Sequence, residues 1–463
     1  MRYVSTRGGA APVGFAETLL AGLAPDGGLY IPETWPAFTT AEIAAFAGRP
    51  YAEVAAEVLA RFAGTDIDRA TIDRLCAEAY ATFAHPAVTP LKQLDSDLWL
   101  LELFHGPTLA FKDVAMQLLA RLYDHVLESR GRTLTIVCAT SGDTGGAAVE
   151  AFRGARHARI VALFPEGRIS EVQRRFMTTT ADANVACAAV EGTFDDCQAI
   201  VKAMFGDDDF RTAVDLSGVN SINWARVAAQ AVYYFTAAVA LGAPARPVGF
   251  CIPTGNFGDA FAGFVAMKMG LPVDRMVVAT NANDIVARAF STGRYSRGAV
   301  VATQSPAMDI QIASNFERLY FEAVGRDAAE TKRAFEAFAA TGAIDLPTQA
   351  SGVWDLFTGI AVDEAETART IALTLAETGE VIDPHTAVAV AAAARVAASD
   401  APLVVLSTAH PAKFPEAVQA ATGLEPALHA RASGLFDRDE RIDHLPADAD
   451  AVKRYVRAFA AAG

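Results

Sequence analysis

Two glycine-rich loops and one lysine hold the residues that could do chemistry in this chain of 463 residues. The first loop, Pro253-Thr-Gly-Asn-Phe-Gly-Asp259, lies between an expected strand at 248–253 and an expected helix at 260–269. Its glycines free the backbone to curve, so that consecutive N–H groups can converge on one anion at the positive end of the helix dipole. The pattern favours a phosphate site, with an ordinary βα turn as the alternative.

The second loop, Ala139-Thr-Ser-Gly-Asp-Thr-Gly-Gly146, also connects an expected strand to an expected helix. Hydroxyls and free N–H groups at a helix start suit a carboxylate or a phosphate. The alternative is a plain N-cap, with Asp143 or Thr144 as the capping residue.

Lys112 follows a Gly-Pro turn and an aromatic residue, and it begins an expected helix. A lysine at that end opposes the helix dipole, so it indicates either a function or a salt bridge with Asp113. A desolvated lysine near positive dipole ends loses proton affinity, which a Schiff-base lysine requires. Together, the lysine and the two anion loops match the needs of pyridoxal 5'-phosphate: one group for its aldehyde, one cradle for its phosphate and one for a substrate carboxylate.

The elements that must position these residues alternate between strand and helix from about residue 97 onwards. Strand, helix and strand in succession predict βαβ units and mostly parallel sheets, with ligand loops at the carboxyl ends of the strands. We expect an α/β protein with an N-terminal domain at 1–92, a first α/β domain with the lysine at 93–245, and a second at 246–463 that ends in a helical tail.

Composition restricts the partners. Lys and Arg total 39 and Asp and Glu total 54, a net charge of −15, which argues against nucleic acid and membrane surfaces. The five cysteines show no C-x-x-C spacing and the eight histidines no H-E-x-x-H, so no metal site is expected. Neither a signal peptide nor a membrane span is evident, and we expect a cytoplasmic protein.

Several blocks resemble the bacterial and fungal threonine synthases, in the fold class of tryptophan synthase β-chains and serine/threonine dehydratases (PLP fold type II). The resemblance runs from Tyr3 to about Val418. The glycine loops alone indicate the larger class, whereas the N-terminal block, Ser-Gly-Asp-Thr-Gly and His-Pro-Ala-Lys-Phe are more specific. The blocks are Ser5–Gly8, Leu23–Tyr30, His105–Asp113, Thr140–Gly145, Asn220–Arg226, Pro253–Asp259, Ser314–Arg318, Asp383–Val388 and Ser407–Phe414.

The resemblance implies a lyase that uses pyridoxal 5'-phosphate to convert O-phospho-L-homoserine and water to L-threonine and phosphate, the last step of threonine biosynthesis. By the same resemblance, Lys112 forms the Schiff base with the cofactor and acts as the catalytic base. The Thr408 hydroxyl faces the pyridine nitrogen. The cofactor phosphate is held by Gly255, Asn256, Phe257, Gly258 and Asp259.

Candidates for the substrate contacts follow from the two ends of O-phospho-L-homoserine. Ser141 and Thr144 are expected to bind its carboxylate. Arg226 is the natural bidentate partner of its phosphate, and an expected helix at 222–241 would put Asn223 on the same face as Arg226. The full phosphate set is Asn220, Ser221, Asn223 and Arg226. Two further candidates near the ring are His410 and Lys413.

Asp143 occupies a position where many relatives in the wider fold class carry Asn. That leaves its contact with the 3'-oxygen of the cofactor open, because two anions would repel each other.

Other functions stay open at this point. A dehydratase or β-replacement enzyme of the same fold (serine/threonine dehydratase or cysteine synthase type) would not need Arg226. A non-catalytic relative would not need Lys112. The sequence does not distinguish a monomer from a homodimer.

Overall fold

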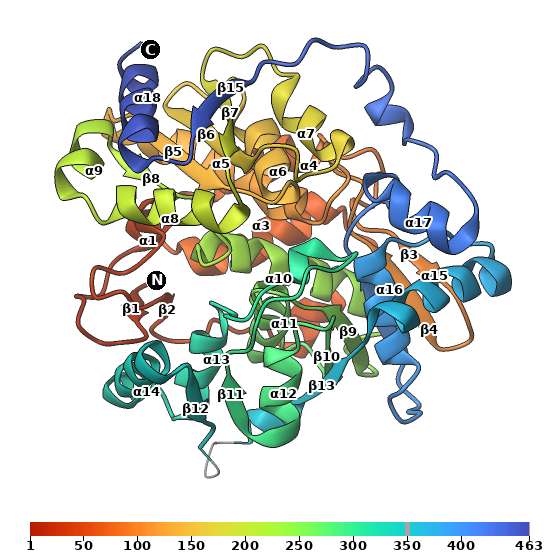
Figure 1. The fold of residues 1–463 in the computed structure, drawn as a ribbon. Coiled ribbons are helices and arrows are strands. Elements are labelled where there is room, and N and C mark those ends of the chain that lie inside the picture. The colour runs from red at the N-terminus through yellow and green to blue at the C-terminus, as the bar shows by residue number, and fades with distance from the viewer. Residues whose placement is uncertain (348–351, 463) are drawn as a thin grey trace.

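Two mostly parallel sheets organise the computed structural model, which describes residues 1–347 and 352–462 (Figure 1). One sheet has six strands, and only its β3–β4 pair is antiparallel. Its strands, in spatial order, are β13 (Phe357–Ala361), β10 (Val273–Thr280), β9 (Val248–Pro253), β14 (Leu403–Ser407), β4 (Leu98–Glu102) and β3 (Leu91–Gln93). The predicted α/β class is confirmed.

The second sheet has five strands, all parallel. In spatial order they are β15 (Asp443–Pro446), β7 (Val185–Glu191), β6 (Ala158–Pro165), β5 (Leu134–Ala139) and β8 (Leu216–Ser217). Alternate residues of β5 face opposite cores, as the two-residue period of a strand requires. Ile136 packs towards α5 (Lys112–Arg130) and α6 (Asp143–Phe152). Val137 packs towards α8 (Phe194–Phe205), α9 (Asp208–Val214) and α18 (Ala449–Ala461).

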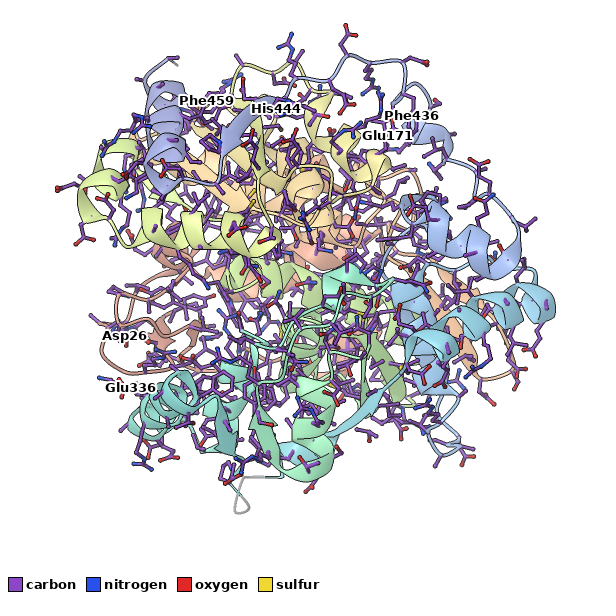
Figure 2. The ribbon with its side chains drawn as sticks, viewed as in Figure 1. Asp26, Glu171, Glu336, Phe436, His444 and Phe459 are labelled. Atoms are coloured by element: carbon purple, nitrogen blue, oxygen red, sulfur yellow. The ribbon has the colours of Figure 1, made fainter. Side chains whose placement is uncertain are left out.

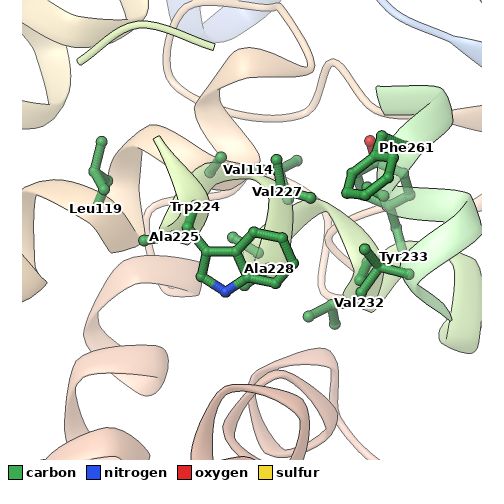
Figure 3. Packing of buried hydrophobic residues seen from close by; sticks show 14 of the residues in the cluster. Val114, Leu119, Trp224, Ala225, Val227, Ala228, Val232, Tyr233 and Phe261 are labelled. Atoms are coloured by element: carbon green, nitrogen blue, oxygen red, sulfur yellow. The ribbon is translucent and has the colours of Figure 1, made fainter. Parts of the chain in front are cut away.

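The six-stranded sheet is covered in the same way. Cys251 of β9 faces the core formed with α15 (Glu364–Thr378) and α16 (Pro384–Ala393). Phe250 faces the main core formed with α10 (Trp224–Ala240) and α11 (Gly258–Lys268). Figure 3 shows this core around the buried Trp224, with side chains of α10 and Phe261 of α11. Both sheets are thus buried on both faces, which is typical of parallel sheets.

The N-terminal region packs against α10. It contains the antiparallel pair β1 (Tyr3–Ser5) and β2 (Tyr30–Pro32) and four helices. The rings of Tyr3 and Phe62 lie 5.9 and 5.4 Å from that of Trp224, so the region shares the main core. Its helices are α1 (Phe15–Ala21), α2 (Thr40–Ala44), α3 (Tyr51–Ala63) and α4 (Arg69–Tyr80).

A smaller unit follows β10. It contains the antiparallel pair β11 (Arg294–Ser296) and β12 (Ala343–Asp345) together with helices α12 (Ile285–Thr292), α13 (Phe316–Ala323) and α14 (Ala328–Thr341). A short 3-10 turn, η1 (Pro306–Met308), lies in the same stretch.

The pairing of strands crosses the domain boundaries that were expected at residues 92 and 245. β4 pairs with β14 of the later part of the chain and carries β3 at its other side, and β15 returns to pair with β7 of the earlier part. The open edge of β7 explains that return, because an edge strand has unpaired N–H and C=O groups.

The tail crosses the upper part of Figure 1 on its way from α17 (Pro415–Thr422) to β15. It is held on α7 (Glu171–Thr178) by Glu440, which accepts two hydrogen bonds from Arg174 at 2.8 and 2.9 Å. Arg175 of α7 also donates to the carbonyl of Phe436, and Figure 2 shows Phe436 and Glu171 close together on this surface.

The five cysteines are all buried, and each belongs to a different element. They are Cys76 in α4, Cys138 in β5, Cys187 in β7, Cys197 in α8 and Cys251 in β9. Within the described residues, no helix is long and apolar enough to cross a membrane.

Candidate active site

Lys112 is the first residue of α5, and its side chain is buried. Its Nζ lies 3.5 Å from Oδ2 of Asp143 and 4.6 Å from the centre of the Phe111 ring. Burial lowers the pKa of the amine; Asp143 opposes that shift, while Lys413 and Arg226 add to it. The result is a lysine that gives up its proton more readily than an exposed one, as a nucleophile or a base must.

The end of β14 holds Lys112 in place. The N–H of Phe111 donates to the carbonyl oxygen of Thr408 at 2.8 Å, and Ala110 and Ala409 form an isolated antiparallel bridge. The start of α5 and the end of β14 are therefore joined by backbone hydrogen bonds. This brings the buried Thr408 next to the segment that carries Lys112.

The second loop turns sharply between β5 and α6. Oγ1 of Thr140 accepts hydrogen bonds from the N–H groups of Gly142 and Gly145, at 2.9 and 2.8 Å. Gly142 occupies the N-cap position with φ 130°, a conformation that favours glycine. Neither Asp143 nor Thr144 caps the helix, so the alternative reading as a plain N-cap does not describe this loop. Ser141 and Thr144 are partly exposed on it, whereas Asp143 points into the buried cluster with Lys112.

The first loop closes against a neighbouring segment. A Cβ at Gly255 would lie 2.7 Å from the carbonyl oxygen of Ala307, which leaves no room for a side chain. Asn315 donates to the carbonyl oxygen of Asn256 twice, from its backbone N at 3.1 Å and from Nδ2 at 3.2 Å. Phe257, with φ 61°, precedes the eleven residues of α11. The first N–H groups of a helix have no partner within it, so the loop is shaped to receive an anion.

Asp259 lies on α11 with its carboxyl turned inwards. Oδ1 accepts hydrogen bonds from the hydroxyls of Tyr233 and Tyr234, and burial raises the pKa of this carboxyl to about 6. Because the side chain is engaged behind the loop, the group that Asp259 can offer to an anion is its backbone N–H.

Arg226 is a buried cation that has no counterion among the described residues. Its Nη1 donates to the carbonyl of Val219 at 3.1 Å, its Nε has no partner, and it forms no ion pair with a carboxylate of the described residues. Burial lowers its pKa to about 10, so it keeps its charge near neutral pH. An unpaired buried charge is costly, and an anionic ligand would supply the missing partner.

The other expected phosphate ligands are placed differently. Helix α10 begins at Trp224 and not at residue 222 as expected, so Asn223 is its N-cap and not a residue of its first turn. The Asn223 side chain accepts from the N–H of Ala225 and donates to the carbonyl of Leu19 and the hydroxyl of Tyr123. These contacts tie the start of α10 to the N-terminal region and to α5. Two expected residues stay closer to the surface: the partly exposed Ser221 and the exposed Asn220.

Three residues join the site without having been singled out from the sequence. Gln173 donates to Oδ1 of Asp143 at 3.0 Å, and its Ser170-x-x-Gln173 spacing is a readable capping box at the start of α7. Arg318, fully buried, donates to Asn315 and to the carbonyls of Tyr30 and Ile222. Both Asn315 and Arg318 lie in a block that carried the resemblance but had no expected role.

His410 lies beside this site, in a histidine cluster. Its ring centre is 5.9 Å from that of His429, and its Nδ1 accepts from the N–H of Ala412. Burial, with the nearby His429 and His105, lowers the pKa of His410 to about 4, so the ring is neutral at pH 7. Among the described residues, no group of three or more His, Cys, Asp or Glu side chains could hold a metal ion.

The fold and the site define a pyridoxal-phosphate-dependent enzyme. The family model described as "Pyridoxal-phosphate dependent enzyme" matches residues 82–408. Two further models, "Threonine synthase N terminus" and "Threonine synthase, C-terminal", match residues 2–80 and 386–456. The chain belongs to the threonine synthase family.

Full-length relatives agree with this assignment. The chain is 50% identical to the threonine synthase of Pseudomonas aeruginosa, over 98% of both chains. Among solved structures it is similar to the PLP-bound threonine synthase of Brucella melitensis, with 53% identity, 99% of each chain covered and a TM-score of 0.97. The threonine synthase of yeast has 37% identity, with 100% of this chain and 99% of that chain covered and a TM-score of 0.94. The chain is thus an enzyme with threonine synthase function and pyridoxal phosphate as its cofactor.

Proposed function

We propose that this enzyme converts O-phospho-L-homoserine and water to L-threonine and phosphate. The observation that carries the proposal is Arg226, a buried guanidinium with an unpaired Nε and without a carboxylate among the described residues. It is close enough to Lys112 to affect the pKa of its amine. A dehydratase acting on serine or threonine has no second anionic group in its substrate that would pair with this charge.

The residues present fit the cofactor. Lys112 would bind its aldehyde, the stretch from Gly255 to Asp259 at the start of α11 would hold its phosphate, and the Thr408 hydroxyl would face the pyridine nitrogen. The glycine at 255 lets the loop close against the carbonyl oxygen of Ala307, where a Cβ would lie at 2.7 Å, and the N–H groups at the start of α11 that follow have no partner within the helix, which suits a phosphate. When bound, the cofactor supplies an electron sink for the charge left on the substrate after its α-proton is removed.

Lys112 does the proton chemistry in this proposal. Its free amine takes the α-proton of the substrate at Nζ and later returns a proton. Burial lowers the pKa of this amine and so favours the neutral form that can act as a base. The side chain of Lys112 is 9% exposed and that of Asp143 is 7% exposed, so bulk water has little access to this transfer.

The substrate contacts divide between the turn before α6 and the start of α10. The hydroxyls of Ser141 and Thr144, on the partly exposed turn before α6, would bind the carboxylate of the substrate. Arg226 would bind its phosphate by charge-assisted hydrogen bonds. Ser221 and Asn220 precede α10 and would complete the phosphate contacts, while Asn223 keeps its structural role.

The test measures inorganic phosphate released from O-phospho-L-homoserine, in parallel with ammonia released from L-serine and L-threonine. Phosphate and L-threonine are expected as products. Lys112→Ala should abolish phosphate release, and Lys202→Ala, at an exposed lysine on α8, is the matched control that should leave it unchanged. Ammonia release without phosphate release would overturn the proposal in favour of a dehydratase.

We further propose that the enzyme works in the cytoplasm, as a monomer or a homodimer. Five unpaired cysteines in a chain of this length suit a reducing compartment. Cell fractionation and light scattering test the two statements separately.

A further inference from the structure

Lys413 is a buried cation that the proposed function leaves without a role. It is 1% exposed and belongs to η3 (Pro411–Lys413), which follows β14. Its Nζ lies 2.8 Å from Oδ1 of Asp143 and donates to the carbonyl oxygen of Thr108 at 2.7 Å. Asp143 begins α6 beside the five-stranded sheet, so this contact joins the two sheets at the catalytic lysine.

The two oxygens of Asp143 have different partners. Oδ1 faces Lys413 and accepts from Gln173 at 3.0 Å, while Oδ2 faces Lys112 at 3.5 Å. Burial alone raises the pKa of this carboxyl, but Lys413 and then Lys112 outweigh it and hold the pKa well below its ordinary range. The carboxylate is therefore ionised between two ammonium groups, with the shorter contact to Lys413.

This arrangement matters when Lys112 loses its charge. A buried carboxylate left without a cation is strongly destabilised, and it would take a proton or pull one from its neighbour. Lys413 lies 2.8 Å from Oδ1 of Asp143, and its hydrogen bond to the carbonyl oxygen of Thr108 does not involve Lys112, so it is placed to remain the partner of the carboxylate when Lys112 is neutral.

We propose that Lys413 is a positioning residue that keeps Asp143 ionised while Lys112 releases and regains its proton. The inference rests on the proposed function, in which Lys112 is the base. In this arrangement, Asp143 and Lys413 together set the charges that surround Lys112 while its own charge changes. It also removes the difficulty of placing an anionic Asp143 near the cofactor, because Lys413 balances its charge.

The other charged groups facing Lys112 come from three elements. Arg226 approaches from α10 and lowers the pKa of Lys112. Asp259 of α11 lies near enough to Lys112 for the lysine to lower the pKa of the Asp259 carboxyl. Asp113, the next residue of α5, is engaged by the N–H and Oγ1 of Thr108, both at 2.7 Å, and burial raises its pKa to about 6. Asp143 is thus the carboxylate that contacts Lys112 directly, and Lys413 is the group that competes for it.

The test is a titration of Lys112 in the apoenzyme. The pH dependence of its acylation by a neutral reagent, read by mass spectrometry of the Lys112 peptide, gives its pKa. In Lys413→Met, Asp143 pairs with Lys112 alone, so the pKa of Lys112 should rise by about one unit or more. In Asp143→Asn it should fall, and in Lys413→Arg, which keeps the charge, it should stay near the wild-type value.

Opposite shifts in the two neutralising variants are the decisive result. A purely structural role for Lys413 and Asp143 would loosen the site in both variants and move the pKa upwards in both. An unchanged or lowered pKa in Lys413→Met overturns the proposal. If Lys413→Met does not fold, Gln173→Met removes the other donor to Oδ1 and should raise the pKa of Lys112 by a smaller amount; a fall or no change there also overturns it.

A second readout uses the holoenzyme. The pH midpoint of the absorbance change of the bound cofactor should move in the same direction in each variant. Neither measurement uses the substrate, so both keep their meaning if O-phospho-L-homoserine is not turned over. Failure of the proposed function and failure of this inference are therefore distinguishable.

Discussion

Gly145 and Gly146 are adjacent glycines at the start of α6, and the structure predicts opposite effects of the same substitution. A Cβ at Gly145 would lie 2.4 Å from Cγ2 of Thr140 and 2.5 Å from Sδ of Met177. A Cβ at Gly146 would meet the Cβ of Phe176 at 3.5 Å, an ordinary van der Waals distance. Gly145→Ala should therefore force the helix away from its loop, while Gly146→Ala should fit.

The magnitudes follow from three contributions. Replacing Gly by Ala inside a helix stabilises it by about 1 kcal/mol. At Gly145 this gain is opposed by overpacking of about 1–3 kcal/mol and by loss of the Thr140–Gly145 hydrogen bond (2.8 Å), worth about 1 kcal/mol. We expect Gly146→Ala to be as stable as the wild type or up to about 1 kcal/mol more stable. Gly145→Ala should be less stable than Gly146→Ala by about 2 kcal/mol or more.

The assay is urea unfolding of both holoenzyme variants, followed by circular dichroism and by the absorbance of the bound cofactor. Gly145→Ala should also shift that absorbance, because the displaced helix carries Asp143 away from Lys112. Gly146→Ala should leave the absorbance unchanged. Equal stability of the two variants, with the same cofactor absorbance, would refute the steric reasoning and the role given to this turn.

Three further predictions concern single buried groups. Arg226→Met should lower kcat/KM for O-phospho-L-homoserine by about 10-fold or more, as the loss of charge-assisted hydrogen bonds implies; Arg226→Lys should recover part of it, and phosphate-release kinetics measure both. Arg318→Met leaves the carbonyls of Tyr30 and Ile222 without their donor and should lower the free energy of unfolding by about 3 kcal/mol in urea titrations. The pKa of Asp259 is raised to about 6, so its protonated form favours the fold at pH 4 and that contribution is lost as the pH rises through 6. The difference in unfolding free energy between the wild type and Asp259→Asn should accordingly fall by roughly 2 kcal/mol between pH 4 and pH 8.

The sequence predicts the local parts of this site well. The two loops lie between a strand and a helix as expected, because turns with glycine at constrained positions are encoded within a few residues. Lys112 begins α5 as expected, because the Gly-Pro turn that precedes it is also a local signal. The position of each loop at the carboxyl end of its own parallel strand could be expected too, but the two loops follow strands of different sheets, β9 and β5, so their convergence depends on how the sheets pack.

Contacts between distant segments are what the sequence could not supply. The pairing of Lys413 with Asp143 depends on how two sheets dock, and no local pattern encodes it. Asn223 shows a subtler limit: a helix that starts at Trp224 and not at 222 turns a residue expected on the helix face into an N-cap. The return of β15 to β7 is likewise set by an open sheet edge and not by any signal in the tail itself.

Because all five cysteines are buried, each can report when its own part of the protein opens. Burial raises the pKa of Cys76 to about 12 and that of Cys197 to about 11, and a thiol reacts only as an accessible thiolate. Each cysteine will therefore take up an alkylating reagent only when its own helix or strand opens. Labelling of Cys76 would report the opening of the N-terminal region, and labelling of Cys251 that of the six-stranded sheet. The other three cysteines would report the opening of the five-stranded sheet and of the helix α8 that covers it. Peptide-by-peptide labelling would thus give the order in which the parts of one native enzyme come apart.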